Sequence, residues 1–114
     1  MEWGHYLSWF FGAAFLTNAV PHFVSGVMGQ PFQSPFAKPH GEGLSSSTVN
    51  VLWGFFNLAV GYALTCRVGA FDFKATPDVA AFGLGVLAMA LLSAHLFGRF
   101  NGGHAPAARS QARS

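Results

Sequence analysis

The chain has 114 residues, of which 52% are hydrophobic and only 9% are charged, and its formal net charge is +2. Soluble domains usually carry about 25% charged residues, so this composition lacks the polar side chains that would cover a soluble surface. The basic residues are scattered and form no basic helix face, which argues against a nucleic-acid-binding protein. The composition therefore favours an integral membrane protein.

The first predicted element is an apolar segment from Trp3 to Met28 that contains no Asp, Glu, Lys or Arg. It exceeds the roughly 20 residues that a helix needs to cross a bilayer. Aromatic residues at its start, such as Trp3 and Trp9, are typical of a membrane interface. Pro21 lies inside the segment and is expected to kink the helix or to end its regular part.

A polar stretch over residues 30–47 follows, with Pro31, Pro35 and Pro39 at intervals of four residues. This spacing excludes an ordinary helix and favours extended or turn conformations. Phe32 and Phe36 follow the first two prolines and are expected to anchor the loop at the membrane interface. We favour a connecting loop on the lipid head groups; the alternative is a loop that covers a site, because irregular backbone at membrane depth needs protein or water around it.

Two further uncharged apolar segments run from Val49 to Cys66 and from Val79 to Gly98. The hydroxyl residues 45–48 can cap the second helix, and the Thr76–Pro77–Asp78 sequence predicts the start of the third, with Thr76 as the N-cap. We therefore predict an all-α polytopic membrane protein with three transmembrane helices and a Pro/Phe-rich interfacial loop. Residues 1–100 form a single domain in this prediction, and residues 101–114 form a disordered C-terminal tail.

The positive charges predict the orientation. The long loop and the C-terminal tail share one side of the membrane and carry four basic residues: Lys38, Arg99, Arg109 and Arg113. The opposite side carries Arg67 and Lys74. Because cytoplasmic loops are enriched in Lys and Arg, we expect the C-terminus in the cytoplasm and the N-terminus outside, in a cell or inner membrane.

Small and polar residues recur at helical spacing in all three segments and are expected to form helix contacts. In lipid, small residues let helices approach closely, and amide side chains can bond across the contact. The predicted packing residues are Gly26, Gly54, Asn57, Gly61, Ala90, Ala94 and Gly98. The lone Cys66 excludes an intrachain disulfide.

Two histidines lie at similar depth in helices that run in the same direction, since His22 and His95 each fall about seven residues past the middle of their segment. The second helix runs the other way, which brings its early residues to the same level. Histidines inside membrane helices are uncommon and tend to face protein or water. The candidate ligand-binding residues are therefore Asn18, His22, Asn50, Trp53 and His95, with His22 and His95 as candidate metal ligands.

Three functions fit this pattern. The first is a non-enzymatic subunit that packs with itself or with partner helices in a larger membrane complex, because three helices bury little and offer more small-residue faces than one chain needs. The second is a subunit that binds haem, a quinone or a metal ion through His22 and His95. The third is a small pore or transporter, although no charged residue is available for a side-chain filter.

In length the chain resembles the small multidrug transporters, and its three apolar segments, with histidines in the first and the third, resemble the membrane anchors of respiratory dehydrogenases in outline. The transporters depend on an intramembrane glutamate, and the three apolar segments contain none. No motif aligns with either family, so neither resemblance assigns a site residue.

Overall fold

The computed structural model describes residues 3–104, which form three helices and one small hairpin. The elements are α1 (Trp3–Val27), β1 (Phe32–Gln33), β2 (Leu44–Ser45), α2 (Ser47–Cys66) and α3 (Thr76–Asn101). Each helix is long and apolar enough to cross a membrane by length and composition. The all-α class and the three predicted apolar helices are therefore confirmed.

The helix boundaries differ slightly from the prediction. α2 begins at Ser47, two residues before the apolar segment, and the predicted cap among residues 45–48 is confirmed, because the Ser46 side chain accepts a hydrogen bond from the Val49 N–H at 3.2 Å. α3 begins at Thr76 after Ala75, which makes no side-chain cap bond, so Thr76 is not the N-cap. α3 also includes Asn101, and residues 105–114 of the predicted tail lie outside the described residues.

Pro21 does not end α1. The helix continues to Val27, and Gly29 then adopts a positive φ of 74°, a conformation that glycine reaches without steric cost. The Gln30 N–H donates to the Ser25 carbonyl at 2.9 Å, which satisfies one of the last helix carbonyls. The chain therefore turns sharply here and enters the hairpin.

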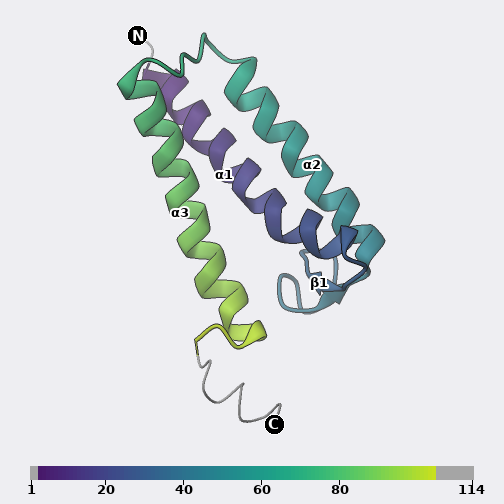
Figure 1. Ribbon diagram of the computed structural model, residues 1–114. Coiled ribbons are helices and arrows are strands. Elements are labelled where there is room, and N and C mark those ends of the chain that lie inside the picture. The colour runs from purple at the N-terminus through teal and green to yellow at the C-terminus, as the bar shows by residue number, and fades with distance from the viewer. Residues whose placement is uncertain (1–2, 105–114) are drawn as a thin grey trace.

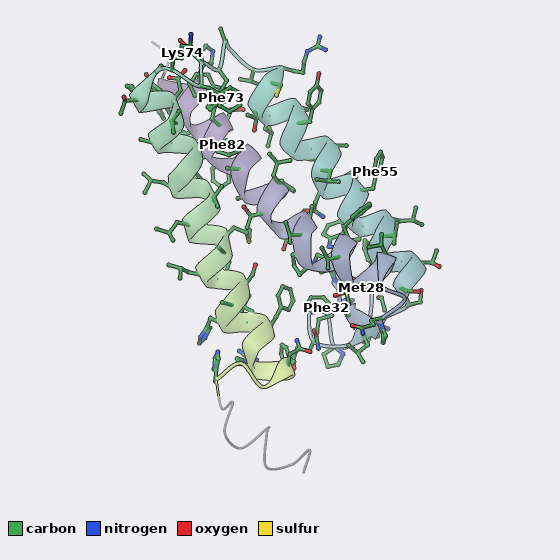
Figure 2. All side chains as sticks on the ribbon, viewed as in Figure 1. Met28, Phe32, Phe55, Phe73, Lys74 and Phe82 are labelled. Atoms are coloured by element: carbon green, nitrogen blue, oxygen red, sulfur yellow. The ribbon has the colours of Figure 1, made fainter. Side chains whose placement is uncertain are left out.

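The three helices form a layer rather than a closed bundle. α1 lies between α2 and α3 and contacts both, and few contacts join α2 to α3 (Figure 1). The hairpin lies at one end of the layer, beside the C-terminal end of α1 and the start of α2 (Figure 1). Phe32 marks this end, and Phe73 and Lys74 mark the opposite end (Figure 2).

Glycines bring α1 and α2 into close contact. A Cβ atom at Gly54 would lie 2.8 Å from the backbone nitrogen of Phe23, and one at Gly61 would lie 2.9 Å from the Gly12 carbonyl oxygen. A Cβ at Gly26 would lie 2.7 Å from the Ser47 carbonyl oxygen. Real Cβ atoms do not approach backbone so closely, so these positions need glycine for the helices to pack at this distance.

α3 packs less tightly and meets α1 closely at one point. A Cβ atom on Gly85 would overlap the Phe10 carbonyl and lie 2.9 Å from Ala13 Cβ. Among the described residues of α3, only Asp78 and Gly85 are buried. The side chains of α3 therefore remain largely uncovered within one chain.

Candidate functional site

The proline-rich loop folds into a short hairpin over the end of the α1–α2 pair. Phe32 pairs with Ser45, and Gln33 pairs with Leu44, in antiparallel register. The Ser34 hydroxyl is buried and bonds the Ser45 hydroxyl, which ties the two strands together through their side chains. The hairpin thereby holds Phe32 against the helices (Figure 2).

His22 is buried at this end, with 2% of its surface exposed. Three aromatic rings surround its imidazole in edge-to-face geometry, and they come from three different segments. The ring centres of Phe32, Phe97 and Trp53 lie 5.5, 5.7 and 6.3 Å from that of His22. His22 of α1 is therefore the point at which the hairpin, α2 and α3 meet.

Asn50 joins His22 to the hairpin. Its Oδ1 lies 2.8 Å from His22 Nδ1, and its Nδ2 lies within 3.2 Å of the carbonyl oxygens of Phe32, Ser45 and Ser46. Asn50 is fully buried. One side-chain amide therefore contacts backbone carbonyls of β1, of β2 and of Ser46, and its two N–H groups are shared among them.

These contacts identify which His22 ring nitrogen donates to Asn50. Three carbonyl oxygens around one end of the Asn50 amide identify that end as the NH₂ group, so the other end is the oxygen acceptor. His22 must then donate its Nδ1–H to Asn50 Oδ1, which leaves Nε2 without a hydrogen bond among the described residues.

A second amide contact lies deeper between the same two helices. Asn18 Nδ2 donates to Asn57 Oδ1 at 3.1 Å, and Asn57 Nδ2 donates to the Trp53 carbonyl at 2.8 Å. Near the other end of α1, the Ser8 hydroxyl donates to the Leu64 carbonyl at 2.7 Å. Ser8, Asn18 and His22 of α1 therefore form hydrogen bonds with α2 at three levels, as polar side chains do between membrane helices.

His95 does not join this site. The α3 residue that reaches His22 is Phe97, and two residues correspond to about 200° of helical rotation, so His95 points to nearly the opposite side. His95 is exposed, and its ring lies 5.1 Å from that of His104. Within one chain, His22 and His95 therefore cannot ligate the same group.

The remaining predicted residues are placed as follows. Trp53 packs against His22, Phe36 and Phe56, and its Nε1 atom is buried with no hydrogen-bond partner among the described residues. Ala90 and Ala94 line a groove of about 390 Å³ between α1 and α3, together with Thr17, Val20, Pro21, Phe32, Ser93 and Phe97. Gly98 contacts His104 of the C-terminal turn rather than another helix.

Two kinds of residue escaped the sequence reasoning. Phe97 was not singled out, and Phe32 was expected to anchor the loop at the membrane interface, whereas its ring packs against His22 and Phe97. With thirteen phenylalanines in the chain, residue type alone does not identify these two. Gly12 and Gly85 form close helix contacts, and their spacing from other small residues was the available signal.

The His22 ring is held by its neighbours. No group of three or more His, Cys, Asp or Glu side chains in residues 3–104 could hold a metal ion. His22 has one nitrogen committed to Asn50, and its ring is enclosed by aromatic carbon. The His22–Asn50 pair therefore organises the hairpin and the helix ends.

No protein-family model, no curated protein and no solved structure matches the chain.

Proposed function

We propose that the protein is a non-enzymatic integral membrane subunit that crosses the bilayer three times and self-associates through α3. In this proposal α1, α2 and the hairpin form a preassembled scaffold, and α3 presents its uncovered side to a second copy. The internal pairing of Ser8, Asn18, His22, Asn50 and Asn57 supports a scaffold role, because these polar groups are already used within the chain.

Gly83 is the observation that carries the proposal. It is exposed on the apolar helix α3, two turns from its start, and nothing lies within 4 Å of the position where its Cβ would be. Gly85, two residues on, faces α1 and is in tight contact. A glycine inside a helix costs about 1 kcal/mol relative to alanine, and at Gly83 no contact within the chain offsets this cost.

Membrane helices use such glycines for close approach to another helix. Leu87 and Ala90 lie one and two turns beyond Gly83 on the same side of α3. Ala90 also lines the groove between α1 and α3, where the Ser93 hydroxyl is buried with no partner among the described residues. A helix seated along Gly83 and Ala90 would border this groove, and a self-complementary contact of this kind suits a two-fold dimer.

The other two functions fit less well. Haem or metal binding was expected to use His22 and His95 as a pair of ligands. The two side chains point apart, so within one chain only one of them could reach a given ion. A quinone could still hydrogen-bond to one of them, but no observation favours that. A pore through one chain is also poorly supported, because α1 fills the middle of the three-helix layer described for residues 3–104.

The test is self-association of purified protein in lipid vesicles, measured by energy transfer between donor- and acceptor-labelled chains. Gly83→Leu should weaken association by about tenfold, equivalent to ~1.4 kcal/mol, because the larger side chain separates the helices. Its helical content should match that of the wild type, since open space surrounds this position in the chain.

Ala59→Leu is the matched control, because Ala59 is also exposed on an apolar helix but belongs to α2. It should leave energy transfer unchanged. Association of Gly83→Leu at wild-type strength would contradict the proposal, as would an equal loss in Ala59→Leu.

A further inference from the structure

At the C-terminal end of α3 the chain turns back toward the last turn of the helix. Gly102 adopts a left-handed conformation with φ of 80°, and its N–H donates to the Gly98 carbonyl. The Gly103 N–H donates to the same carbonyl at 2.9 Å. This pattern is a glycine-terminated helix end, and it directs the next residue, His104, back along the last turn.

His104 rests on Gly98. A Cβ atom at Gly98 would lie 2.8 Å from His104 Cδ2 and 3.0 Å from His104 Nε2. Any larger residue at position 98 would push the imidazole away. The absence of a side chain at Gly98 therefore lets His104 lie beside His95, with 5.1 Å between ring centres and 32° between ring planes.

We propose that His95 and His104 together chelate a divalent transition-metal ion, such as Cu²⁺ or Zn²⁺. Two imidazoles on one tetrahedral metal, each with a metal–nitrogen distance of about 2.0 Å, hold their ring centres roughly 5 Å apart. The observed separation matches this arrangement. Neither ring makes a hydrogen bond to any residue in the part of the chain that the structure describes, so each has a lone pair to offer.

The surroundings suit metal access. Both histidines are exposed at the end of the apolar helix. The guanidinium of the neighbouring Arg99 lies over the Phe100 ring, 5.0 Å from its centre, so this cation is engaged with another residue. Water can supply the remaining coordination positions, because two protein ligands leave two positions open on a four-coordinate ion. In this proposal His95 is a metal ligand, as the sequence suggested, but its partner ligand is His104 rather than His22.

The experiment is a titration of the full chain with Cu²⁺, using protein in detergent that was purified without a histidine tag. Electron paramagnetic resonance reports the ligands through nitrogen coupling, and competition with Zn²⁺ reports the preferred metal. The wild type should bind one ion per chain through two nitrogen atoms. His95→Ala and His104→Ala should each weaken binding by roughly tenfold or more, since even changes outside the ligand set cost about that much.

Two further variants separate this site from others. His40→Ala is the control, because His40 is exposed in the loop and bonds the Pro35 carbonyl. It should bind Cu²⁺ as the wild type does, with two nitrogen ligands. Gly98→Ala should weaken binding while both histidines remain, because the added methyl displaces His104. Equal Cu²⁺ affinity in the wild type and in His104→Ala would overturn the proposal, and so would a nitrogen signal lost only on replacing His40.

Discussion

Asn50 makes more contacts between segments than any other polar side chain described between α1 and the hairpin. It accepts from His22 of α1 and donates toward Phe32 of β1 and toward the Ser45 and Ser46 carbonyls before α2. Because buried backbone carbonyls need hydrogen-bond partners, loss of this amide would leave several carbonyl oxygens without a donor at once. Asn50 is therefore the side chain that links α1, the hairpin and the start of α2.

The isosteric substitution Asn50→Asp tests this link. A carboxylate oxygen would replace the NH₂ group and face three carbonyl oxygens. The hydrogen bonds would then be replaced by repulsion between oxygen atoms. We expect a loss of about 2 kcal/mol or more in unfolding free energy, measured by circular dichroism during titration with a denaturing detergent. Asn57→Asp is the comparison, since Asn57 Nδ2 donates to one carbonyl only and should cost less. Equal losses in the two variants would refute the special role of Asn50.

At the scale of elements, glycines determine which helix faces meet. The sequence pattern predicted the three helices and the loop. Uncharged apolar stretches of about 20 residues indicate long apolar helices, and prolines at intervals of four exclude an ordinary helix between them. The rotation of α3 was not predictable, since apolar residues surround this helix on every side and no polar face marks the contact with α1. For the same reason the sequence left the direction of His95 open. The contact between Phe32 and His22 depends on how the hairpin folds back onto the helices. The spacing of residues along the sequence does not determine this fold.

Alanine substitutions at two glycines should have opposite effects. Gly54→Ala places a methyl 2.8 Å from the backbone of Phe23, and backbone cannot move aside as a flexible side chain can. We expect a loss of about 1–3 kcal/mol in stability from overpacking. Gly83→Ala meets no atom within 4 Å and should stabilise the single chain by up to ~1 kcal/mol through helix propensity. Thermal loss of helix signal at low protein concentration measures both, and the same sign in both variants would contradict the assigned faces.

At the scale of the whole molecule, the two ends differ in charge and in structure. Lys38 lies in the hairpin loop and Arg99 in the last turn of α3, at the hairpin end. Arg67 follows α2 at the other end, where Figure 2 shows Lys74. With the two arginines beyond residue 104, the positive charge favours the hairpin end in the cytoplasm. This orientation is a prediction from charge, and the arrangement of the helices is compatible with either direction.

Cys66 provides a direct probe of orientation, because it is exposed at the end opposite the hairpin. A membrane-impermeant maleimide added to intact cells should label Cys66 of the wild type. In a Cys66→Ala background, Ala37→Cys in the loop should be labelled only after the cells are permeabilised. The reverse labelling pattern would invert the orientation and leave the three helices in place.

Self-association through α3 is most directly tested by cysteine crosslinking in native membranes. In a Cys66→Ala background, Gly83→Cys should be captured by a short bifunctional reagent as a product of twice the chain mass, because the proposed contact brings the two copies of position 83 together. Leu58→Cys, on α2 and also exposed, should remain at the mass of one chain under the same conditions. A Gly83→Cys protein that stays at the mass of one chain, or that crosslinks no better than Leu58→Cys, would show that this face of α3 meets lipid.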